Sequence, residues 1–337
     1  RLRSDALEKT ARAEQAEKLA GERVFRKYRR RRLLRFMLRA CSRNLKRDIR
    51  LLNPANAPLL LAYYGSHKRS IRDFLTITLH STLLFIAAYL AVFFIGLLAA
   101  SVSGVFFNYN SMIYHHEVLW LVKPEQWFGD SVKMIYTAGP VLSGIIAVFL
   151  AIWFAYVRTG TGLGKLFLLW AFMHGFNAFF GSLLIGSLFD RGFGYAIIWS
   201  YISDTEKVIY TIISITSMIL LGVFVTRSFL ISANSYFSKL ERPWQRSFIW
   251  AQVILPFLLG NGFIALLMLP QVVLYDMTVS LSLGLAIIPI AIGYRFSPSL
   301  YFEEDYRMIR IRPWLVIACL AFILVYRLVL GFGIMMG

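Results

Sequence analysis

The chain has 337 residues, of which 58% are hydrophobic and 16% charged, and its mean hydropathy is +0.62. This composition is typical of a membrane protein with several spans and excludes an ordinary water-soluble domain. The two cysteines, Cys41 and Cys319, are too few and too far apart for a disulfide framework or a cysteine metal site.

Charge is concentrated at the start of the chain. The stretch from Arg1 to Asp73 carries 21 Lys/Arg and 7 Asp/Glu, so it holds +14 of the net charge of +18. Residues 1–52 show helical patterning, and between Arg26 and Arg50 apolar residues alternate with basic ones. This pattern predicts a basic amphipathic helix on the cytoplasmic side that contacts anionic lipid headgroups or a protein partner. The basic residues that we expect to make this contact are Arg26, Lys27, Arg29, Arg30, Arg31, Arg32, Arg35 and Arg39.

Nucleic acid is the other polyanion that such a helix could meet, but the sequence holds no nucleic-acid recognition motif. A basic helix that stays solvated and only fixes the orientation of the chain is an equally simple interpretation. The chain starts with arginine and shows no signal peptide, which leaves room for residues upstream of Arg1.

A linker at 53–73, broken by Pro54 and Pro58, precedes the apolar part of the chain. From residue 74 to 337 we predict an all-α transmembrane bundle of about seven spans. The fifth and sixth spans are separated only by Asp276, which suggests a tight helical hairpin. The predicted spans are 74–105, 134–157, 166–189, 208–232, 248–275, 277–294 and 314–336.

The loops sort by charge. With a cytoplasmic N-terminus, nine basic residues fall in the inner loops and four in the outer loops, which agrees with the positive-inside rule. Seven spans then put the C-terminus on the outer side. We therefore expect a multi-pass protein of a plasma membrane, such as the bacterial inner membrane.

Five polar residues fall within the predicted spans, where an unpaired polar group is costly. They predict an intramembrane polar cluster inside the bundle, which serves either a transport path or hydrogen bonding between helices. Spans three and five, broken by glycine and proline, are candidates for the discontinuous helices of transporters. The absence of a carboxylate from the middle of any span disfavours a proton-coupled pump. The five residues are His80, His174, Asn177, Asn261 and Arg327.

In the outer loop, His115, His116 and Glu117 are weak candidates for a metal site. Adjacent histidines point apart on regular structure, and no further ligand follows at a diagnostic spacing. We therefore expect no metal ion and no other cofactor.

Three pieces of the sequence, taken in order, resemble the site-2 protease family of intramembrane zinc metalloproteases. Gly139-Pro140 in span two is similar to the family's Gly-Pro signature. Asn177 and the later Phe-Asp-Arg-Gly at 189–192 resemble its Asn-containing run, and His80 stands where the zinc-binding helix is expected. The resemblance covers about residues 74–195.

The resemblance lacks the family's catalytic motif. Zinc-dependent hydrolysis there needs two histidines one turn apart with a glutamate between them, whereas His80 is followed by Ser-Thr-Leu-Leu and no His-Glu-x-x-His occurs. The resemblance therefore implies a catalytically dead relative.

The absence of catalytic motifs favours a non-enzymatic membrane subunit that anchors or scaffolds a complex through its basic N-terminal helix. Its expected partners are the lipid bilayer, anionic headgroups and other proteins of the complex. Two alternatives remain, a transporter or channel for small solutes or lipids, and the dead protease relative.

Overall fold

The computed structural model describes residues 57–158, 160, 162–302 and 309–337. The predicted basic helix at 1–52 lies outside the described residues. The chain divides into two compact units, residues 1–69 and residues 70–337, and the second contains all the spans described below. Residues 57–73, which we expected to belong to a linker, are helical and form the start of α3 (Ala57–Val105).

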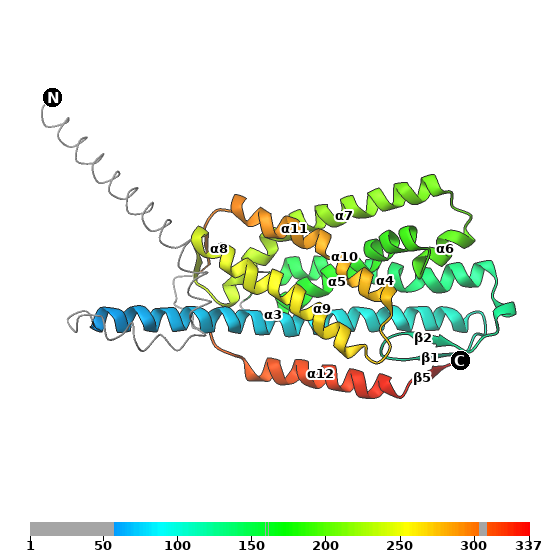
Figure 1. The fold of residues 1–337 in the computed structure, drawn as a ribbon, viewed down its shortest axis with the longest axis horizontal. Helices are drawn as coiled ribbons and strands as arrows, with labels where there is room; N and C mark the ends of the chain where they lie inside the picture. The colour runs from blue at the N-terminus through cyan, green and yellow to red at the C-terminus, as the bar shows by residue number, and fades with distance from the viewer. Residues whose placement is uncertain (1–56, 159, 161, 303–308) are drawn as a thin grey trace, which may run out of the picture. The chain divides into compact units, whose positions relative to one another are not determined.

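The described part of the chain is an all-α bundle, as predicted, and seven of its helical segments are long and apolar enough to cross a membrane (Figure 1). By this measure the chain is a multi-pass membrane protein. The candidate spans are Ile71–Val105, Gly129–Val157, Gly164–Phe189, Asp204–Ser235, Trp244–Leu267, Leu274–Phe296 and Pro313–Gly331. Their helices are α3, α4 (Gly129–Val157), α5 (Gly164–Phe189), α7 (Asp204–Ile231), α8 (Arg242–Ile249) with α9 (Leu255–Leu267), α10 (Leu274–Ser282) with α11 (Gly284–Gly293), and α12 (Pro313–Gly331).

Helices α3 and α5 form the centre of the bundle. In their most apolar windows 56% and 61% of the residues are buried, compared with 17% in α4 and 22% in α12. Because lipid tails are as apolar as leucine, the exposed apolar faces of α4 and α12 suit a bilayer. Polar side chains that the sequence places on α3 and α5 are therefore enclosed by protein.

Small residues let neighbouring helices approach closely. A methyl group on Gly139 of α4 would lie 2.9 Å from the carbonyl oxygen of Gly96 on α3. A methyl group on Gly222 of α7 would lie 2.2 Å from the carbonyl oxygen of Ala286 on α11. Such backbone contacts replace the hydrophobic driving force that a bilayer does not supply.

Short strands lie at both ends of the bundle, and Figure 1 labels those at the end with the C-terminus. At one end, the sheet end, β1 (Ser111–Ile113) pairs antiparallel with β2 (Val118–Trp120) and with β5 (Ile334–Met336). At the other, the α8 end, β3 (Lys239–Leu240) pairs with β4 (Leu300–Tyr301). The predicted seventh span at 314–336 is thus too long, because α12 ends at Gly331 and the chain continues into β5.

The fifth and sixth spans also differ from the prediction. Helix α9 ends at Leu267 and α10 begins at Leu274, so Asp276 lies in the first turn of α10 and not in a turn between two spans. Span three, one of the two candidates for a discontinuous helix, is the unbroken helix α5. The break lies in span six, between α10 and α11 at Leu283.

A π-helical segment, η4 (Trp250–Ile254), joins α8 to α9. Its cause can be read from the sequence, because Pro256 follows Gln252 by four residues. The proline has no N–H to bond the Gln252 carbonyl, and its ring crowds that carbonyl. Widening the helix by one residue per turn relieves the crowding, and such segments often lie at functional positions.

Candidate functional site

The carbonyl group freed by Pro256 is bonded from another helix. The Ser81 hydroxyl of α3 donates to the Gln252 carbonyl oxygen at 2.6 Å, and the Trp170 indole N–H of α5 donates to Ser81 Oγ at 3.0 Å. The side-chain amide of Gln252 donates to Ser232 Oγ at 3.1 Å. These side chains are fully buried, so one hydrogen-bonded group joins α3, α5, the end of α7 and η4.

His80 lies beside this group, at the α8 end, and is fully buried. The backbone N–H of Arg312 donates to His80 Nε2 at 3.1 Å. That contact makes Nε2 an acceptor, so the neutral ring carries its proton on Nδ1. The ring stacks on Tyr236 with centroids 6.1 Å apart. Within the described residues, His80 Nδ1, the Tyr236 hydroxyl and Gln252 Oε1 are buried and have no hydrogen-bond partner.

Asn177 bonds to the break between α10 and α11. The Leu283 N–H bonds to the Ser280 carbonyl, so the carbonyl of Val279 loses its regular helical partner. The Asn177 side-chain amide donates to that Val279 oxygen at 2.7 Å. The Ser282 hydroxyl lies 2.9 Å from Asn177 Oδ1 and can donate to it. Asn177 therefore fastens α5 to the break in span six.

Asn261 reaches the same broken span from the other side. Its Oδ1 accepts from the Ser280 hydroxyl at 2.6 Å, and its amide donates to the Phe257 carbonyl of its own helix. Asn177 thus bonds irregular backbone of the broken span, and Asn261 bonds a side chain of the same span. Polar residues commonly stabilise helix packing in membranes in this way.

His174, one turn before Asn177 on α5, is enclosed by aromatic rings. The ring centroids of Phe85 and Tyr89 lie 4.4 and 5.4 Å from that of His174, and that of Trp170 lies at 6.3 Å. His174 hydrogen bonds to the backbone of Phe85. Its Nε2 is buried without a partner among the described residues.

Arg327 lies at the sheet end and binds the loop that precedes β2. Its guanidinium bonds to His115 Nε2 and donates to the Leu269 carbonyl at 2.5 Å. The hydroxyl of Tyr326 donates to the His115 carbonyl at 3.0 Å. Burial, and after it the Arg327 charge, lowers the pKa of His115 to about 4, so this imidazole is neutral at pH 7.

The neighbouring His116 has different partners. Its Nε2 lies 3.0 Å from Gln271 Oε1 and 3.5 Å from a Glu117 carboxylate oxygen. Because an amide oxygen only accepts, His116 Nε2 carries the proton of the neutral ring. Within the described residues no three His, Cys, Asp or Glu side chains are arranged to hold a metal ion, and this includes the group at His115–Glu117.

Asp276 is a residue that the sequence analysis placed wrongly, in a turn between two spans. It is partly buried in the first turn of α10, and its carboxylate interacts electrostatically with Glu117 and with the phenols of Tyr89 and Tyr326. The sequence signal that could have found it is the run at 268–273, where Pro270 and Gln271 allow a loop to begin before Leu274.

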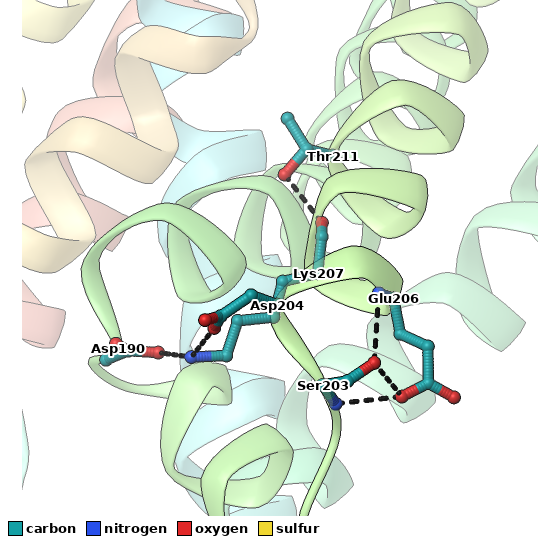
Figure 2. Close-up of polar contacts among 6 residues, drawn as sticks. All are labelled: Asp190, Ser203, Asp204, Glu206, Lys207 and Thr211. Carbon is teal, nitrogen blue, oxygen red and sulfur yellow. Dashed lines mark hydrogen bonds and ion pairs between the residues drawn. The ribbon is translucent and has the colours of Figure 1, made fainter.

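Asp190, part of the resemblance to site-2 proteases, follows α5 at the sheet end. Its carboxylate binds Lys207 of α7 at 2.8 Å, next to the Ser203–Glu206 capping box that starts α7 (Figure 2). The distance along α5 from Trp170, the neighbour of Ser81, to Asp190 is 20 residues, about 30 Å. Asp190 and His80 therefore cannot share a metal ion, and the resemblance stays a prediction.

The five residues expected to form one cluster thus occupy three places. His80 lies at the α8 end, where Arg312 and Tyr236 contact it. His174, Asn177 and Asn261 lie in the middle of the bundle. Arg327 lies at the sheet end, where it contacts His115.

No protein-family model, no curated protein and no solved structure matches this chain.

Proposed function

We propose that the protein is a non-enzymatic integral membrane subunit that anchors or scaffolds a membrane complex. The observation that carries the proposal is the use of polar side chains inside the bundle. Ser81, Asn177 and Asn261 all bind irregular segments of neighbouring helices, and so serve to fix the packing of the bundle. A bundle held in this way is a rigid platform.

The contact with a partner is assigned to the basic residues between Arg26 and Arg39, as the charge asymmetry of the sequence predicts. A cluster of positive charge at the cytoplasmic surface attracts anionic lipids and acidic protein surfaces. On this proposal the α8 end of the bundle faces the cytoplasm. Plasma membranes, including the bacterial inner membrane, are the expected location.

The test compares two full-length variants with the same change in net charge. In the first, six basic residues of the proposed contact become glutamine, and in the control six basic residues nearer the start become glutamine. The first set is Arg26, Lys27, Arg29, Arg30, Arg31 and Arg32, and the control set is Arg1, Arg3, Lys9, Arg12, Lys18 and Arg23.

Each protein is extracted from its native membrane in polymer nanodiscs, and its size and composition are measured by native electrophoresis and mass spectrometry. We expect the wild type and the control in a larger assembly with a constant second protein, and the first variant without that protein. A wild-type chain that runs alone would contradict the proposal.

A further inference from the structure

Helix α8 is fixed on the bundle by one of its faces. Phe248 and Ile249 are buried in the core, and so is Gln245, whose side-chain amide donates to the Pro298 carbonyl at 2.7 Å. These contacts determine how the helix is turned about its axis. Another face of α8 is exposed, at the end of the bundle away from the C-terminus (Figure 1).

Arg242, Arg246 and Trp250 follow one another on this exposed face at intervals of four residues. All three are exposed, and the backbone N–H of Trp250 donates to the Arg246 carbonyl, so the helical spacing holds to the end of the series. Side chains four residues apart lie on the same side of a helix, about 6 Å apart along its axis. Two guanidinium groups and then an indole ring therefore line one face of α8.

The series lies where the surface of the membrane is expected. The candidate span that contains α8 starts at Trp244, so Arg242 precedes it by two residues and Arg246 lies two residues inside it. Tryptophan is enriched at the level of the headgroups, and a charged side chain within a span commonly has a partner of opposite charge. The order arginine, arginine, tryptophan matches the order of phosphate and acyl chains in a phospholipid.

The described part of the chain does not neutralise these two arginines. Glu241, the carboxylate next to α8, is bound to Lys239 at 2.7 Å, and no ion pair of Arg242 or Arg246 occurs among the described residues. Like charges four residues apart on a helix repel each other. A phosphate between the two guanidinium groups removes this repulsion, and arginine binds phosphate oxygens with paired hydrogen bonds.

We propose that this face of α8 binds one anionic phospholipid, with Arg242 and Arg246 on the phosphate and Trp250 against the upper part of the acyl chains. We call these three residues the α8 lipid site. It is separate from the predicted basic contact at 26–39, and it does not rest on the subunit function proposed above.

The charges of α8 select the kind of lipid. Two guanidinium groups attract a headgroup with a net negative charge, whereas the carboxylate of Glu241 is bound to Lys239 and does not receive a choline group. The exposed indole of Trp250 selects a lipid over free phosphate, because it offers an apolar surface to the acyl chains.

The test compares two full-length double variants with the same loss of charge. Arg242→Gln with Arg246→Gln removes both guanidinium groups of the α8 lipid site. The control, Arg72→Gln with Arg158→Gln, removes two other exposed arginines, one on α3 and one at the end of α4. The basic residues at 26–39 are present in every protein, so the lipid that they bind does not differ between the variants.

Native mass spectrometry of the delipidated proteins measures the binding of dioleoylphosphatidylglycerol and, separately, of dioleoylphosphatidylcholine. We expect the wild type and the control to bind one phosphatidylglycerol molecule at least about tenfold more tightly than the α8 variant does, because two arginines at a membrane surface attract an anionic headgroup. Phosphatidylcholine should not distinguish the three proteins.

Thermal unfolding in detergent provides a second readout. Added phosphatidylglycerol should raise the melting temperature of the wild type and the control more than that of the α8 variant. Gel filtration checks that each variant is folded, and the single variants Arg242→Gln and Arg246→Gln replace the double variant if it is not. The proposal is overturned if the α8 variant binds phosphatidylglycerol as tightly as the wild type, if the control loses as much affinity, if phosphatidylcholine separates the proteins equally well, or if inorganic phosphate stabilises the wild type as much as the lipid does.

Discussion

A single missing N–H, that of Pro256, determines the contacts of several buried residues. The carbonyl of Gln252 has no N–H four residues ahead to bond, and Ser81 donates to it from α3, while Trp170 donates to Ser81. All three side chains are fully buried, and the alternative to these bonds is an unpaired polar group in the bundle. The proline can be seen in the sequence. The sequence does not show that Ser81, 171 residues before Gln252, donates to the Gln252 carbonyl.

Replacing Ser81 with alanine tests this arrangement. Ser81→Ala removes the only bond that the described residues supply to the Gln252 carbonyl from outside its helix and leaves the Trp170 N–H unpaired, so we expect a loss of about 1–3 kcal/mol in stability. Ser103→Ala is the matched control on the same helix, because Ser103 only donates to the Ala99 carbonyl four residues before it. The measurement is reversible unfolding in bicelles, and equal losses in both variants would contradict the argument.

His115 predicts a pH dependence of stability. Its pKa falls from 6.5 to about 4 on folding, because burial and then the Arg327 charge disfavour the imidazolium. Between these pH values the unfolded chain binds a proton that the folded protein does not. Stability should therefore fall as the pH is lowered from 6.5 to 4, by at most about 3 kcal/mol, and change no further below pH 4 on account of this group.

The variant His115→Gln isolates this contribution, because glutamine can still accept from Arg327 but does not titrate. We expect its melting temperature to fall less than that of the wild type between pH 7 and pH 4.5. His116→Gln, next to it in the chain, serves as the control for a change in the loop. A wild-type slope that His115→Gln leaves unaltered would exclude the effect.

The irregular elements of the bundle lie in spans five and six, and polar side chains of α3, α5 and α9 bond to them. The break at Leu283 frees the Val279 carbonyl, which Asn177 bonds, while Asn261 bonds Ser280 one residue further. These contacts explain why asparagines occur at membrane depth. The sequence indicates that Asn177 and Asn261 need partners, but not that both partners lie on one short helix.

Asn177→Leu should loosen the break. Without the asparagine amide, the Val279 carbonyl loses its bond to α5, and we expect faster amide hydrogen exchange at Leu283 and Gly284 with a stability loss of about 1–3 kcal/mol. Asn261→Leu is the comparison, since Asn261 accepts from the Ser280 hydroxyl and donates to the Phe257 carbonyl of its own helix but does not bond the Val279 carbonyl. Exchange at the break that increases equally in both variants would show that Asn177 has no special part in it.

At the scale of the whole molecule, hydropathy predicted the number of spans and their order, because a run of about 20 apolar residues is typical of a transmembrane helix. It failed where apolar sequence continues past the end of a helix. The loop at 268–273 and strand β5 are both hydrophobic enough to extend a predicted span, so Asp276 was placed in a turn and α12 was made too long. Contacts such as that of Arg327 with His115, 212 residues apart, have no signature in a single sequence.

The bundle has one end on each side of the membrane, and the charge of the loops predicts that the α8 end is cytoplasmic. Labelling of single cysteines tests this orientation.

In a background of Cys41→Ser and Cys319→Ala, single cysteines can be placed at two exposed aromatic positions. Tyr201, between α6 (Phe193–Trp199) and α7 at the sheet end, is 90% exposed, and Phe296 at the α8 end is 85% exposed. A membrane-impermeant maleimide applied to intact cells should label Tyr201→Cys and spare Phe296→Cys, whereas both should react after permeabilisation. Labelling of Phe296→Cys alone in intact cells would show the reverse orientation, and labelling of both would contradict the seven-span arrangement.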